Sequence, residues 1–93
     1  MSVTAIVKLT ALPGQRDTLA TAMAPSVEAT RAQQACLAVD LLAGIEKPDD
    51  LILVEHWTSV EAHENFIGGM IEDGKLDDIL PLLAGDIETS HYR

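Results

Sequence analysis

The order of hydrophobic patterns along the chain limits the folds that it can adopt. Residues 3–12 alternate in the period of two that is typical of a β-strand, with one face formed by Val3, Ala5, Val7 and Leu9. Residues 15–34 carry apolar side chains every three to four positions, which predicts a helix. Pro25 lies inside this segment, and we expect it to kink the helix or split it in two.

The second half of the chain adds two strands and a second helix. The apolar run at residues 35–43 predicts a strand, and residues 51–57, rich in β-branched and large apolar side chains, predict a strand covered on both faces. Thr58 and Glu61 match a capping box, which predicts that a helix begins at Thr58. The apolar face of this helix would comprise Ala62, His63, Phe66, Ile67 and Met70.

The end of the chain completes the pattern. Residues 76–83 predict a short helix and residues 86–92 a last strand. The order β-α-β-β-α-β is that of the ferredoxin-like fold, an α+β fold with an antiparallel sheet and both helices on one face. We therefore expect a single domain over residues 1–93.

The composition indicates that this domain pairs with a second copy of itself. The chain has 93 residues, of which 47% are hydrophobic but only 3% aromatic, so the core is thin and aliphatic. The sheet face without helices still carries apolar side chains and needs a cover. Small domains often gain stability by oligomerising, and the sequence thus predicts a homodimer in which the second subunit covers this face.

Charge and cysteine content exclude several classes of protein. The net charge is −9, which disfavours binding to nucleic acids and to anionic membranes. The single cysteine, Cys36, cannot form a disulfide within one chain, and no apolar run approaches the roughly 18 residues of a membrane span. No basic and apolar leader opens the chain. We expect a cytoplasmic protein.

Four stretches of the sequence resemble the antibiotic biosynthesis monooxygenase-like family of small dimeric α+β barrels. Residues 5–14 are similar to the family's first strand and its Pro-Gly exit, and residues 25–31 to the end of its first helix. Residues 36–41 resemble its second strand. Residues 51–62 resemble a strand that ends in Glu-x-Trp, followed by a helix that starts Ser-x-Glu-Ala.

The resemblance implies a cofactor-independent monooxygenase that oxidises a small aromatic substrate, such as a quinol or an anthrone, with O2. Some members of this family degrade haem, and that branch has an Asn in the first strand and a Trp within the second helix. This chain has Thr4, Ile6 and Lys8 in the first strand, and its tryptophan ends the third strand. We therefore set haem degradation aside and expect no cofactor. The alternatives are a non-catalytic dimeric module that binds a hydrophobic ligand or a partner enzyme, and a purely structural dimer.

Three residues are candidates for catalysis. His63 can act as the base that removes a substrate proton near neutral pH, and the Asn65 amide can polarise a carbonyl oxygen. The Trp57 ring offers a stacking surface for a planar ligand. The alternatives are a solvated His63 between Glu61 and Glu64, and a Trp57 that only fills the core.

Other residues could line the substrate pocket. Phe66, His56 and Tyr92 are candidates, although His56 and Trp57 must face opposite sides of their strand, and the sequence does not say which side meets the helices. Tyr92 could instead lie at a dimer contact or in a frayed end. The histidines and their acidic neighbours match no compact pattern of metal ligands, so we expect no metal.

Overall fold

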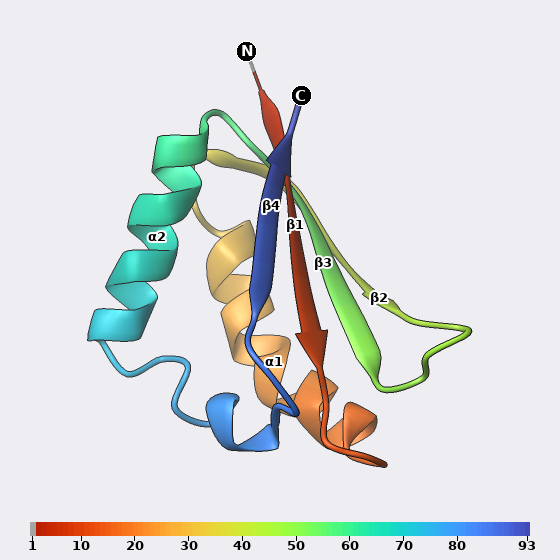
Figure 1. Ribbon diagram of the computed structural model, residues 1–93. Helices are drawn as coiled ribbons and strands as arrows, with labels where there is room; N and C mark the ends of the chain where they lie inside the picture. Colours follow the sequence, from red (N-terminus) through yellow and green to blue (C-terminus); the bar gives the residue numbers. More distant parts are fainter. Residues whose placement is uncertain (1) are drawn as a thin grey trace.

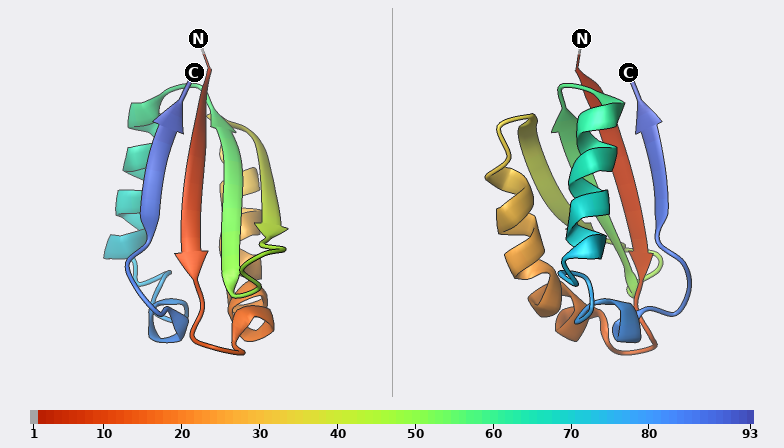
Figure 2. Two further views of the ribbon diagram at one scale, coloured as in Figure 1. Left: turned by 45° about the vertical axis from the view of Figure 1, so that its right-hand side comes forward. Right: turned by 90° about the vertical axis from the view of Figure 1, so that its left-hand side faces the viewer.

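A four-stranded antiparallel sheet carries two helices on one of its faces (Figures 1 and 2). The computed structural model describes residues 2–93. Its elements, in chain order, are β1 (Val3–Thr10), α1 (Arg16–Arg31), β2 (Cys36–Ala43), β3 (Asp50–Trp57), α2 (Val60–Glu72), a 3₁₀ turn (Leu80–Leu82) and β4 (Glu88–Tyr92). The predicted α+β class and the β-α-β-β-α-β order are therefore confirmed.

In the strand order β2-β3-β1-β4, the first strand lies in the middle of the sheet, and the last strand lies beside it at one edge (Figure 2). The four alternate residues of β1 that the sequence pattern places on one face are buried under the helices: Val3, Ala5, Val7 and Leu9. The register pairs Ala5 with Glu55 on β3 and with His91 on β4. Because directly paired residues point to the same side of a sheet, these three side chains form one row on the helix-covered face.

The helices differ from the sequence prediction in detail. Pro25 does not split α1, which runs as one helix through it. The predicted helix at residues 76–83 is a set of turns that ends in the single 3₁₀ turn, consistent with Pro81 and its missing backbone N–H. No helix within residues 2–93 has the length and the apolar character needed to cross a membrane.

The second helix is capped by Ser59 and not by Thr58. The Ser59 hydroxyl accepts a hydrogen bond of 3.1 Å from the Ala62 backbone N–H. Ala62 occupies the position at which a capping box needs Glu or Gln, so only half of that motif is present. The acidic residue in the first turn, Glu61, still suits the positive end of the helix.

Replacing Ser59 by Ala should destabilise the fold by about 1 kcal/mol, because one N–H at the start of α2 loses its acceptor. For a domain of this size, that corresponds to a melting temperature lower by about 4–8 °C. Thermal unfolding followed by circular dichroism measures the change. Thr58→Ala is the matched control, and an equal loss in both variants would contradict the assignment of the cap.

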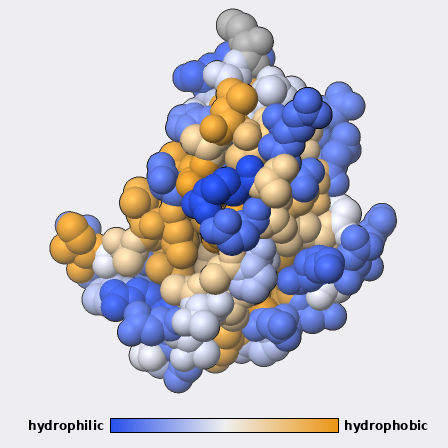
Figure 3. All heavy atoms as spheres, turned by 180° about the vertical axis from the view of Figure 1, so that it is seen from behind, coloured by the Kyte–Doolittle hydropathy of each residue, from blue (hydrophilic) through white to orange (hydrophobic). Residues whose placement is uncertain are grey.

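The sheet face opposite the helices is partly apolar. It carries Ile6 from β1 and Ile52 and Val54 from β3, and the edge strand β2 adds the exposed Leu42. Seen from behind, hydrophobic residues gather on the side where β2 and the loop after it lie (Figure 3). This surface is the one for which the sequence predicts a second subunit.

Candidate functional site

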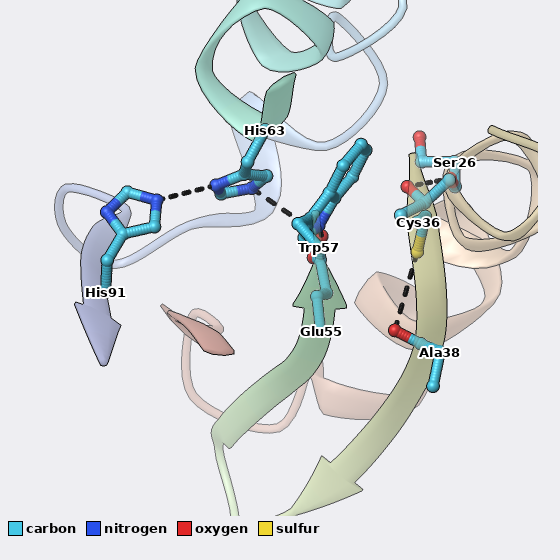
Figure 4. A network of polar contacts seen from close by, with 8 residues as sticks. Ser26, Cys36, Ala38, Glu55, Trp57, His63 and His91 are labelled. Carbon is cyan, nitrogen blue, oxygen red and sulfur yellow. Dashed lines mark hydrogen bonds and ion pairs between the residues drawn. The ribbon is translucent and has the colours of Figure 1, made fainter. Parts of the chain in front are cut away.

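The row Glu55–Ala5–His91 crosses three neighbouring strands beneath α2. Neighbouring strands lie about 4.8 Å apart, so Glu55 and His91 stand on either side of Ala5, two strand spacings apart. Ala5 is fully buried, and its methyl group fills little of the space between them. His63 descends from α2 over this space and contacts both residues (Figure 4).

The carboxyl group of Glu55 is buried in the core. It is 1% exposed. Trp57 lies two residues further along the same strand and therefore on the same face, and its indole Nε1–H donates a 2.8 Å hydrogen bond to Glu55 Oε1. Burial raises the pKa of Glu55 above its usual range, and the hydrogen bond from Trp57 offsets part of this effect. A carboxylate with a raised pKa is a stronger base than an ordinary glutamate.

His63 lies between Glu55 and the surface. It is 1% exposed, and its Nδ1 is 2.9 Å from His91 Nε2, a hydrogen bond in which one ring donates and the other accepts. Its Nε2 lies 3.6 Å from Glu55 Oε1 and makes no hydrogen bond to any of the residues 2–93 that the structure describes. Burial, followed by the nearby His91, lowers the pKa of His63. The neutral imidazole is thus favoured, with one nitrogen free to exchange a proton.

A small cavity lies between the helices and the sheet, next to this group. Its volume is about 70 Å³, enough for a few water molecules at roughly 10–15 Å³ each. Aliphatic side chains from both helices and from three strands form most of its wall. Among the described residues that line it, Glu55 carries the one ionisable group, with hydroxyls from Ser26, Thr30 and Thr89.

Two surface grooves flank α2. The groove between α1 and α2 has a volume of about 470 Å³ and includes Asn65 and Phe66, and it shares Ser26 and Met70 with the cavity. The groove between α2 and β4 measures about 420 Å³ and is lined by His63 and His91, among others. It shares Ile67 and Thr89 with the cavity. The interior site therefore borders on open surface on both sides of α2.

The structure brings together some of the residues predicted from the sequence and separates others. The His63 and Trp57 ring centroids are 5.3 Å apart, and those of Phe66 and Trp57 are 5.5 Å apart. Trp57 is fully buried and its N–H is occupied by Glu55. Asn65 is exposed and lines the α1–α2 groove.

His56 and Tyr92 lie away from the cavity. Both point to the sheet face opposite the helices, where His56 Nδ1 is 3.1 Å from Thr4 Oγ1 and Tyr92 is largely exposed. This follows from strand alternation, because Trp57 and His91 occupy the helix-covered face. Neither residue therefore touches the group formed by Glu55, His63 and His91.

The sequence analysis did not select Glu55 or His91. Two signals in the sequence could have identified Glu55: it is a lone acid in an apolar strand, and it shares a face with the one tryptophan. His91 alternates with Ile87 and Thr89, which places it on their side of the last strand. Their closeness depends on the pairing of both strands with β1, which no single segment reveals.

The pKa of Glu55 makes a prediction about stability and pH. The unfolded carboxyl loses its proton above about pH 4.5, whereas the buried carboxyl keeps it to higher pH. Between these values, rising pH favours the unfolded state. Glu55→Gln removes this effect, so the stability of the variant relative to the wild type should increase as pH rises from 4 to 8. Urea unfolding at several pH values measures it, and a constant difference would contradict the raised pKa.

His63 should act in the opposite direction. Its pKa is lowered, so the unfolded state binds a proton below about pH 6.5 while the folded state resists it. Acid therefore costs stability through His63, and this contribution is recovered as pH rises. As pH rises, the contribution of Glu55 to stability falls and that of His63 grows. The same urea experiment can therefore tell the two contributions apart by their sign.

The described residues do not form an evident metal centre. Within residues 2–93, no three side chains of the His, Cys, Asp and Glu types gather as a metal ion requires. Whether activity is independent of metal stays a prediction, which metal removal tests.

Known structures resemble this one along its whole length. Rv0793 from Mycobacterium tuberculosis has 20% identity and a TM-score of 0.83, with 100% of this chain and 94% of that chain covered. A Bordetella bronchiseptica protein named for the antibiotic biosynthesis monooxygenases has 19% identity and a TM-score of 0.86, with 99% and 95% covered. A Chloroflexus aurantiacus protein named likewise has 27% identity and a TM-score of 0.75, with 98% and 90% covered.

Sequence comparison agrees with the fold. No curated protein matches the chain at a significant level. Residues 2–68, which include β1 to β3, Glu55, Trp57 and His63, match the family described as antibiotic biosynthesis monooxygenase. This match covers well over half of the chain, and the protein therefore belongs to the antibiotic biosynthesis monooxygenase family.

Proposed function

We propose that the protein is a cofactor-independent monooxygenase that oxidises a small aromatic substrate, a quinol or an anthrone, with O2. The observation that carries this proposal is the buried carboxyl of Glu55 at the edge of an apolar cavity, next to the free Nε2 of His63. A base in such a place can remove a proton from a weakly acidic substrate while water is excluded.

The reaction needs only proton removal, O2 and proton return. Glu55 takes a proton from the phenolic hydroxyl or from the acidic carbon, which leaves an electron-rich anion. This anion reduces O2 and forms a bond to it. Loss of water from the resulting peroxide leaves a carbonyl group, so that a CH2 group and O2 give C=O and H2O. Glu55 and His63 supply the proton for the departing water.

The α1–α2 groove offers a place for the aromatic ring. The cavity alone is smaller than a polycyclic substrate, but it shares Ser26 and Met70 with the groove. A planar molecule lying against Phe66 could direct its reacting edge past these residues toward Glu55. The Asn65 amide at the groove could then hydrogen-bond a substrate oxygen.

Oxygen consumption by metal-stripped protein tests the proposal. A panel of quinols and anthrones is supplied, with heat-denatured protein as the control for autoxidation. Uptake well above this control is the expected result. Uptake equal to the control for the whole panel would contradict the proposed activity.

A second candidate function is a non-catalytic module that binds a small hydrophobic ligand. The observation in its favour is the mainly aliphatic wall of the small cavity. Such a module would bind an aromatic probe such as 1-naphthol across the cavity and the adjoining α1–α2 groove. Binding would shift the amide signal of Met70, which lines both, yet leave oxygen unconsumed.

We also propose that the working form is a homodimer closed over the open sheet face. Its apolar side chains, Ile6, Ile52, Val54 and Leu42, support this. Light scattering at micromolar concentration should give twice the 10.0 kDa of one chain. Leu42→Asp should give the single-chain mass, because it places a charge in the apolar contact. The exposed Ile71→Asp on α2 is the control, and a wild-type monomer would contradict the dimer.

A further inference from the structure

We propose that Glu55, His63 and His91 form a proton relay that connects the buried cavity with the groove between α2 and β4. This inference deepens the proposed function, because it assigns a path for the proton that Glu55 removes from the substrate. It also gives His91, near the end of the chain, a role in the transfer of protons rather than in substrate binding.

The contacts form a continuous path across the protein. Glu55 lines the cavity, and its Oε1 lies 3.6 Å from His63 Nε2. On the other side of the same ring, His63 Nδ1 lies 2.9 Å from His91 Nε2. His91 is partly exposed and lines the α2–β4 groove. One end of the path therefore lies at the interior cavity and the other at the surface groove.

The unpaired nitrogen of His63 is the second observation. A buried polar atom without a hydrogen bond is costly and needs an explanation, and His63 Nε2 is such an atom. It faces the carboxyl group across a gap slightly longer than a hydrogen bond. Catalytic hydrogen bonds are often long in the free enzyme and shorten when substrate binds. The unpaired His63 Nε2 is explained if it accepts the proton that Glu55 takes from the substrate.

The transfers conserve protons at each step. Glu55 takes the substrate proton and passes it to His63 Nε2. His63 then gives the proton on Nδ1 to His91 Nε2, and His91 releases its own Nδ1 proton to water. The reaction later needs a proton for the departing water, and the same steps in reverse supply it and restore both ring tautomers.

The charges around the relay favour exchange between its members. Burial raises the pKa of Glu55 and lowers that of His63, which brings the two values closer together. Further titratable groups near the relay include Glu64 on α2 and Cys36 on β2, and Arg31 at the end of α1 acts on Cys36. Of these, Glu64 acts on His63 and partly offsets the lowering of its pKa.

Exchange of the His63 ring proton with water tests the relay without any substrate. The exchange rate is measured by NMR in protein labelled with ¹⁵N-histidine. His91→Gln keeps a hydrogen-bonding side chain beside His63 but cannot pass a proton on. We expect exchange to slow by about tenfold or more, and added imidazole to restore it. His56→Gln, which removes the histidine on the opposite sheet face, should leave the rate unchanged.

Two results would overturn the relay: an unchanged rate in His91→Gln, or a slower rate that imidazole does not restore. If His91→Gln does not fold, His91→Asn takes its place.

Slow exchange that imidazole restores, in a protein that consumes no oxygen, would support the relay and contradict the oxygenase. Unchanged exchange in an active oxygenase would contradict the relay alone. In that active enzyme, the relay predicts a lower kcat for His91→Gln, with KM unchanged and rescue by imidazole.

Discussion

Replacing Glu55 by Gln should lower kcat by about 10²–10⁴-fold, the usual contribution of a positioned base. Glutamine has nearly the same shape as glutamate, and its carbonyl oxygen can still accept the hydrogen bond from Trp57 Nε1. It cannot take a proton from the substrate at neutral pH. The expected loss is therefore in kcat, while KM changes little, because the wall of the cavity is preserved.

Glu61→Gln is the matched control for this change. Glu61 lies in the first turn of α2 but is exposed, so its loss should leave kcat as it is. Steady-state oxygen consumption gives both constants for the two variants. If Glu55→Gln retained the full kcat, another group would have to be the base, and the role assigned to the buried carboxyl would be wrong.

Replacing Trp57 by Ala should have the largest effect on stability. Trp57 is among the largest fully buried side chains, and it contacts the rings of His63 and Phe66. Removing a buried aromatic side chain costs about 3–5 kcal/mol. Small domains are stable by only about 5–15 kcal/mol, so the melting temperature should fall by about 12–40 °C.

Two further variants separate packing from hydrogen bonding at this position. Trp57→Phe keeps much of the ring but leaves Glu55 without its N–H donor, for an expected cost of about 1–3 kcal/mol. Ile71→Ala, at an exposed position of α2, should change stability by less than about 0.5 kcal/mol. Thermal unfolding ranks the three. A Trp57→Ala protein as stable as Ile71→Ala would contradict the central packing role of Trp57.

Local sequence patterns predicted the helices and strands, because a helix or strand is determined largely by residues that are close together in the sequence. The alternation from Val3 to Leu9 correctly grouped the residues of one face of β1, which is the buried face, and the apolar run before Trp57 identified β3. The predicted cap of α2 was off by one residue because Thr58 and Ser59 can both cap a helix, and only the backbone conformation selects Ser59.

The site depends on contacts between distant segments, and these are harder to predict. His63 stands between two acidic residues in the sequence, which suggests a solvated position, yet it is buried. Its surroundings are set by the pairing of Ala5 with Glu55 and with His91. These pairings join the first strand to the third strand and to the last strand of the chain. The volume of the cavity likewise depends on side chains from both helices and from three strands.

Labelling with ¹⁸O2 tests the central claim most directly. Metal-stripped protein is supplied with the best substrate of the panel under ¹⁸O2, and the product is analysed by mass spectrometry. We predict one ¹⁸O atom in the new carbonyl group, formed at a rate that Glu55→Gln greatly reduces. Product that carries oxygen from water, or that forms equally fast with Glu55→Gln or with heat-denatured protein, would contradict a cofactor-independent monooxygenase that works through Glu55.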